Sequence, residues 1–158
     1  MWGWMKIAGA LLVLTLLPGV VPAAETPLEA FGALVVGEWE AEDSRHVLEW
    51  GVARKVVRSS SYFKVEGEWT LVSEGLWFWD ARQEQVRGVA VATGMPVELF
   101  EYRSKIRENE VVHELDAQGP AGGKFVERWK FGGGEYRWTL ESPQGGEPIM
   151  GGTFQRAD

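Results

Sequence analysis

The sequence predicts an all-β protein, an antiparallel up-and-down β-barrel of about ten strands with a short N-terminal helix. Aromatic residues make up 12% of the chain, and 20 of its 158 residues are glycine, a composition that suits pleated sheets joined by tight turns. Turn signals recur along the chain and divide it into short segments. Apolar and polar residues alternate within these segments, as in residues 111–116, where Val111, His113 and Leu115 share one face.

The alternation gives each predicted strand one apolar face, and that face has to be covered. The chain offers one short helix for this purpose, so closing the sheet on itself is the economical arrangement. Closure also removes the exposed edges of the sheet. A two-sheet sandwich would show the same periodicity and stays as the alternative.

An export signal is predicted over residues 1–23. Lys6 precedes an apolar run over residues 7–17, and Val21 and Ala23 occupy the small-residue positions before a cleavage site. The apolar run is too short to cross a hydrocarbon core of roughly 30 Å as a helix. We therefore expect an exported protein, periplasmic or extracellular, that does not span a membrane after cleavage and whose residues 24–158 form one barrel domain.

A short helix is predicted to follow the signal. Thr26 fits the N-cap, Pro27 the first helical position and Glu29 the third, which is the pattern of a capping box. A helix of about two turns is not stable alone, so we expect it to pack on the barrel. The predicted packing face consists of Leu28, Phe31 and Leu34.

Composition and charge argue against several functions. The chain has no cysteine and two histidines, His46 and His113, so a disulfide scaffold is ruled out and a metal site is not expected. Its 16 basic and 23 acidic residues give a net charge of −7, which disfavours nucleic acid as a partner. We predict a protein that uses no cofactor.

No motif for nucleophilic catalysis or phosphate binding is present. The chain contains no Gly-x-Ser-x-Gly sequence, and the serines at residues 59–61 are predicted to lie in a strand. The glycine clusters at residues 119–123 and 132–134 lack the helix and the lysine of a phosphate-binding loop. We interpret both clusters as hairpin turns.

Two polar residues are predicted to face the interior. His113 lies on the apolar face of its segment, and Glu127 alternates in step with Trp129. An inward histidine is either a hydrogen-bonded core residue or a ligand-binding residue. A buried carboxylate needs a partner, for which we expect His113 or an arginine, or it marks a polar point in a ligand cavity.

Six aromatic residues are candidates for lining this interior: Trp69, Trp77, Trp79, Trp129, Tyr136 and Trp138. Plain core packing is the alternative interpretation. A ten-strand barrel encloses more volume than side chains comfortably fill, so it can hold one small apolar ligand. In residues 75–79, Leu76 and Phe78 compete with the two tryptophans for the inward positions.

The tripeptide Gly-Glu-Trp at residues 37–39 opens the first predicted strand, and Phe-Gln-Arg at residues 154–156 closes the last. Together with the strand-turn-strand sequence of residues 75–95, they resemble the calycin group, in particular exported bacterial lipocalin-like domains of unknown function. Fatty-acid-binding and nitrobindin-like barrels are relatives within that group. The resemblance implies that Arg156 stacks on the ring of Trp39 and clasps the barrel.

The leading hypothesis is an exported, non-enzymatic protein that binds a small, largely apolar molecule inside the barrel. One alternative is a cavity enzyme, of the isomerase or cyclase type, that uses His113 and Glu127 for acid/base chemistry. Another is an envelope protein-interaction module with a solid core. Nitrobindin-like members bind haem through a histidine near the C-terminus, and this chain has no histidine after His113, so haem is not expected.

Overall fold

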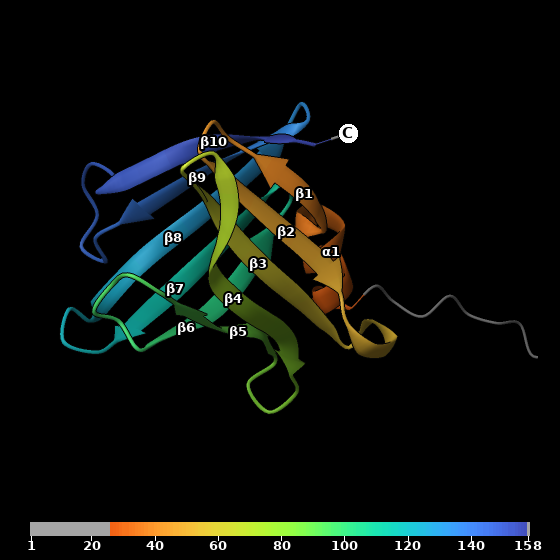
Figure 1. Ribbon diagram of the computed structural model, residues 1–158. Coiled ribbons are helices and arrows are strands. Elements are labelled where there is room, and N and C mark those ends of the chain that lie inside the picture. Colours follow the sequence, from red (N-terminus) through yellow and green to blue (C-terminus); the bar gives the residue numbers. More distant parts are fainter. Residues whose placement is uncertain (1–25, 158) are drawn as a thin grey trace, which may run out of the picture.

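The computed structural model describes residues 26–157 and shows an all-β fold with one short helix (Figure 1). The predicted export signal, residues 1–23, lies outside the described residues. The elements are α1 (Pro27–Val35), β1 (Gly37–Glu40), β2 (Ser44–Trp50), a 3-10 helix η1 (Val52–Arg54), β3 (Val56–Val65), β4 (Glu68–Asp80), β5 (Gln85–Ala92), β6 (Leu99–Arg107), β7 (Glu110–Gln118), β8 (Gly123–Gly132), β9 (Glu135–Glu141) and β10 (Met150–Arg156).

The ten strands form one closed antiparallel barrel. Each strand pairs with its neighbours in sequence, and β1 pairs with β10 to close the sheet. The predicted up-and-down barrel is therefore confirmed, and the two-sheet sandwich is excluded. Both predicted glycine-rich turns are confirmed as well: residues 119–122 connect β7 to β8, and residues 133–134 connect β8 to β9.

Helix α1 begins with the predicted capping box. The Glu29 backbone N–H donates to Thr26 Oγ1 at 3.2 Å, and the Thr26 backbone N–H donates to Glu29 Oε2 at 2.9 Å. These two bonds satisfy N–H groups that a helix start leaves without partners. Within residues 26–157, no helix is long and apolar enough to cross a membrane.

The buried face of α1 covers one end of the barrel, where the helix packs against β4, β5 and β6 (Figure 1). Leu28, Phe31 and Val35 are buried, and the Phe31 ring stacks on Trp77 with centroids 6.0 Å apart. Leu34, which was predicted for this face, is only partly buried. The helical period brings the residue seven positions after Leu28 back onto the same face, so Val35 takes that place.

The large apolar side chains of the core gather in the half of the barrel next to α1. They occupy alternate positions of their strands, as a closed sheet with one apolar face requires. These buried residues are Trp39, Leu48, Val57, Trp77, Val86, Val111, Trp129, Phe131, Tyr136 and Phe154. Burial of each such side chain stabilises the fold by about 1.5–3 kcal/mol relative to exposure.

The predicted clasp between the two ends of the sheet is confirmed. Trp39 and Arg156 are cross-strand partners, and the guanidinium lies 5.1 Å from the centroid of the indole. Arg156 also donates from Nη2 to the Val36 carbonyl at 3.2 Å. A Cβ at Gly37 would lie 3.0 Å from that Nη2, so the glycine leaves room for the stacked arginine.

A β-bulge in β4 reverses the facing of its first residues. Ser61 pairs with Ser73 whereas Tyr62 pairs with Leu71, so β4 contains one residue more than β3 at this point. Because facing alternates with every residue, the extra residue turns Trp69 outward, opposite Lys64, whose Nζ lies 5.0 Å from the ring centroid. The predicted inward position of Trp69 is therefore wrong.

Candidate functional site

Three polar side chains are buried among the described residues, and they come from three adjacent strands. They are Ser104 on β6 (3% exposed), His113 on β7 (0%) and Glu127 on β8 (7%). The register places Ser104 opposite His113 and His113 opposite Glu127, so the three inward positions form a row across the sheet. The sequence analysis missed Ser104, although its alternation with Tyr102 and Ile106 could have indicated it.

His113 lies at the junction of the apolar core and this polar row. Its Nδ1 shares a hydrogen bond of 2.8 Å with Ser104 Oγ, whereas its Nε2 has no hydrogen-bond partner among the described residues. The rings of Trp129 and Tyr102 lie 4.6 Å and 5.4 Å from it, edge to face. Burial lowers the pKa of His113 to about 3, so the imidazole is neutral at physiological pH.

Glu127 is held by two indoles. Trp129 and Trp138 both donate from Nε1 to its Oε1, each at 2.6 Å. Burial raises the pKa of Glu127, and the two indole donors oppose that rise because they stabilise the carboxylate. The expected partner, His113 or an arginine, is therefore wrong. Alternation turns the nearest arginine, Arg128, to the outer face, where it pairs with acidic residues.

His113 and Glu127 do not form an acid/base pair. They are direct cross-strand partners, yet among the described residues each side chain bonds elsewhere, His113 to Ser104 and Glu127 to the two indoles. A proton relay needs the two groups within hydrogen-bond reach. The expected hydrogen bond between His113 and Glu127 is therefore not formed.

The second histidine, His46, is partly buried at an inward position that the sequence analysis did not predict. Its ring stacks on Phe154, with centroids 4.4 Å apart, and its Nδ1 shares a hydrogen bond with the Tyr136 hydroxyl. Burial lowers the pKa of His46 to about 4 and raises that of Tyr136. The alternation of His46 with Leu48 along β2 was the signal for an inward position.

In residues 75–79 the two tryptophans, and not Leu76 and Phe78, take the inward positions. Trp77 is buried, and Trp79 packs partly buried against the core. The Trp77 indole lies against Gly88, where an added Cβ would be 2.5 Å from Nε1. That Nε1 has no hydrogen-bond partner among the described residues. Of the other predicted lining residues, Trp129 and Tyr136 are buried and Trp138 is partly buried.

The half of the barrel away from α1 differs from the packed half. On β3, β4 and β5 its inward positions carry small residues: Ser59, Ser61, Ser73, Gly75, Ala90 and Ala92. On β6, β8 and β9 its inward positions carry larger ones: Phe100, Tyr102, Phe125, Trp138 and Leu140. These larger residues are only partly buried although the register turns them inward.

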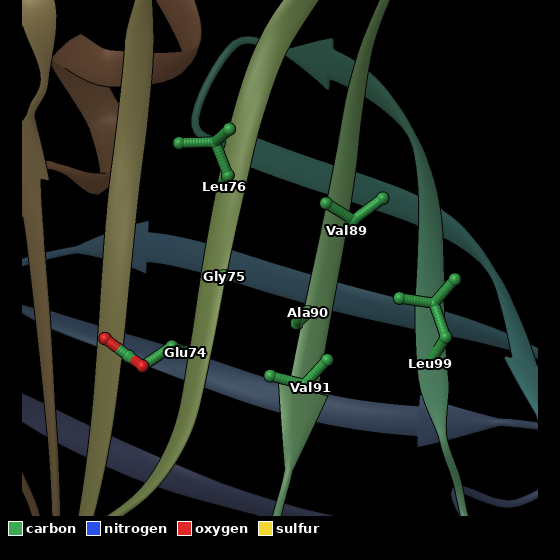
Figure 2. Close-up of a pocket in the computed structure, with 7 residues that line it drawn as sticks. All are labelled: Glu74, Gly75, Leu76, Val89, Ala90, Val91 and Leu99. Atoms are coloured by element: carbon green, nitrogen blue, oxygen red, sulfur yellow. The ribbon is translucent and has the colours of Figure 1, made fainter.

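A shallow pocket lies on the outer face of β4, β5 and β6 (Figure 2). Its volume is about 280 Å³, and it is lined by Glu74, Gly75, Leu76, Val89, Ala90, Val91 and Leu99. Leu76, Val89 and Leu99 occupy the outward positions of their strands. None of the residues predicted to line the interior contributes to this pocket.

In the part of the chain that the structure describes, no group of three or more acidic or histidine side chains is placed to hold a metal ion. The fold and the site together define a closed ten-strand antiparallel barrel with a buried polar row beside partly exposed aromatic residues. No protein-family model, curated protein or solved structure matches the chain.

Proposed function

We propose that the barrel binds a small, largely apolar molecule in the half of its interior away from α1. The observation that carries this proposal is the partial exposure of Phe100, Phe125 and Trp138 at inward positions. Inward aromatic rings lose their exposure when neighbouring side chains fill the space in front of them. Their accessibility supports an interior that another molecule can occupy.

The two walls of this half complement each other for binding. Serine, glycine and alanine on β3–β5 leave room, whereas the aromatic residues on β6, β8 and β9 offer apolar surface. Binding sites for small molecules combine such apolar surface with a few fixed polar groups. His113 and Glu127 supply polar groups at the boundary with the packed half.

The proposal also includes the family relationship of the protein and its location. The clasp of Trp39 and Arg156 on a closed barrel supports kinship with the calycin group and its exported lipocalin-like domains. The signal-like residues 1–23 support export to the periplasm or the extracellular space. A carrier is favoured over an enzyme because His113 and Glu127 each bond to other residues.

Titration with the uncharged fluorescent probe N-phenyl-1-naphthylamine tests the proposal. We expect saturable binding that quenches tryptophan emission, and Trp138→Ala should weaken it about 5- to 150-fold, as for the loss of 1–3 kcal/mol of direct contact. Trp69→Ala is the matched control because its indole lies on the outer face, and it should bind as the wild type does.

Native mass spectrometry of protein purified from its own envelope is the second arm, and we expect a co-purifying small molecule. Absence of probe binding to the folded wild type would overturn the carrier function. An equal loss in Trp69→Ala and Trp138→Ala would place the probe outside the barrel and leave the protein-interaction module as the better hypothesis.

A further inference from the structure

Among the described residues, the interior of the barrel holds a carboxyl group but no positively charged side chain. Among the described residues Glu127 is the one buried carboxylate, and no lysine or arginine is buried. Arg156, at the closed end of the barrel, is exposed over Trp39. An anionic ligand such as a fatty acid would therefore find a carboxylate and no cation to neutralise it, which is unfavourable in a site withdrawn from water.

The hydrogen bonds of Glu127 leave one of its oxygens available. Both indole donors, Trp129 and Trp138, bond to Oε1, whereas Oε2 makes no hydrogen bond to the described residues. Burial raises the pKa of Glu127, and the two N–H donors at Oε1 oppose that rise. A cation placed against the carboxyl group would stabilise its ionised form further. The side chain is thus fixed in place while half of its capacity to accept hydrogen bonds is unused.

Three aromatic side chains lie near this carboxylate. Trp129 and Trp138 donate hydrogen bonds to it, and the Tyr102 ring packs 5.4 Å from the ring of His113, the cross-strand partner of Glu127. Burial raises the pKa of the Tyr102 phenol, and the nearby Glu127 raises it further. The faces of such rings carry negative electrostatic potential and attract cations, most strongly where water is excluded. The ring faces and the carboxylate therefore both attract a positively charged ligand.

The other titratable groups that face Glu127 do not compete for it. Burial lowers the pKa of His113, on β7, and raises the pKa of Tyr102, on β6, and of Tyr136, on β9. His46, on β2, is hydrogen-bonded to Tyr136, and burial lowers the pKa of His46 as well. All four side chains are neutral near pH 7, so the protein itself supplies no positive partner there.

From this arrangement we propose that the ligand is an organic cation, an apolar amine or a quaternary ammonium compound, whose charge lies against Glu127 and the rings of Trp129, Trp138 and Tyr102. The proposal rests on the interior binding function proposed above and adds the charge of the ligand. The net charge of −7 also concentrates cations near the protein and speeds their encounter with it.

The test compares three ten-carbon probes that differ in the head group: decyltrimethylammonium, decanol and decanoate. Isothermal titration calorimetry at pH 7.5 should show the cation binding about tenfold or more tightly than the alcohol, with decanoate weakest. Glu127→Gln keeps an oxygen that can accept the indole bonds. It should lower the affinity for the cation about tenfold and leave the affinity for decanol unchanged. Glu114→Gln, on the outer face of β7, is the control and should bind like the wild type.

The outcomes separate the two proposals. If none of the three probes binds the folded wild type, the interior binding function fails and the cation proposal with it. If decanol or decanoate binds as tightly as the cation, the cation proposal is overturned while the carrier function stands. Unchanged cation affinity in Glu127→Gln would also overturn the cation proposal and leave the carrier function standing. The order of the three probes on the wild type decides the matter even if that variant does not fold.

Discussion

Trp138 on β9 and Glu127 on β8 are joined by a hydrogen bond of 2.6 Å from the indole Nε1 to Oε1. The bond links a partly exposed residue to a buried carboxylate, so it lies at the boundary between the packed half and the accessible half of the barrel. Because Trp129 donates to the same oxygen, the position of the carboxylate depends on both indoles.

Trp138→Phe should therefore destabilise the protein by about 0.5–1.5 kcal/mol at pH 7, since it removes one of the two hydrogen bonds to a buried carboxyl group. The free energy of urea unfolding measures this effect. Trp79→Phe is the control, because its indole is also partly buried but makes no side-chain hydrogen bond among the described residues. Equal losses in the two variants would show that the bond to Glu127 contributes nothing beyond packing.

Removing either member of the clasp should destabilise the closed barrel, and the two losses should differ in size. Trp39→Ala should cost about 3–5 kcal/mol, because a buried ring is lost and a cavity remains. Arg156→Ala should cost about 0.5–1 kcal/mol, as is typical of a cation–ring contact at an exposed site. Thermal and urea unfolding of both variants, with Gln155→Ala as the neighbouring control, measure these losses. An Arg156→Ala variant no less stable than the control would contradict a stabilising clasp.

Gly88→Ala should destabilise the protein by about 1–3 kcal/mol through overpacking. The new Cβ would lie 2.5 Å from Nε1 of the buried Trp77, so the indole has to move within a filled core. Gly132→Ala is the matched control, because nothing lies within 4 Å of its Cβ position. The prediction is wrong if the two alanine variants have the same urea midpoint.

Stability should fall as the pH is lowered from 6.5 towards 4. The pKa of His113 is about 3 in the folded protein and near 6.5 in the unfolded chain. Between these values the unfolded state binds more protons, so His113 contributes a loss approaching 1.4 kcal/mol for each pH unit. His46 acts in the same direction. Glu127 acts in the opposite one, because its raised pKa gives stability at low pH that is lost as the pH rises.

The difference between the wild type and His113→Asn isolates the contribution of His113. The asparagine amide can keep a bond to Ser104 but does not titrate. Urea unfolding of both proteins at a series of pH values should give curves that converge as the pH falls below 6.5. Curves that stay parallel down to pH 4 would mean that His113 is not held neutral by burial.

Alternation along the chain was sufficient to find much of the candidate site. It placed His113 and Glu127 at inward positions, and both are buried. One partner of Glu127, Trp129, is two residues away on the same strand. The other partner, Trp138, could not be found from alternation, because it depends on which residues of two neighbouring strands end up adjacent. Only the register of β8 with β9 brings Trp138 near the carboxylate.

Trp69 shows where alternation fails. The period of two holds only while the strands pair one residue to one, and a single extra residue in β4 interrupts that pairing. No residue type in the sequence predicts this bulge, because it forms only when β4 pairs with β3. The facing of every residue before it in the strand is reversed.

The sequence by itself determined the class of fold and the capping box of Thr26 and Glu29 that starts α1, because these follow from local patterns. The stacking of Arg156 on Trp39 was implied by the resemblance to the calycin group. The tertiary structure decided which polar groups meet inside the barrel and which half of it is packed. The physical reason is that hydrogen-bond partners and packing depend on atoms brought together from distant strands, and closure of the barrel sets those distances.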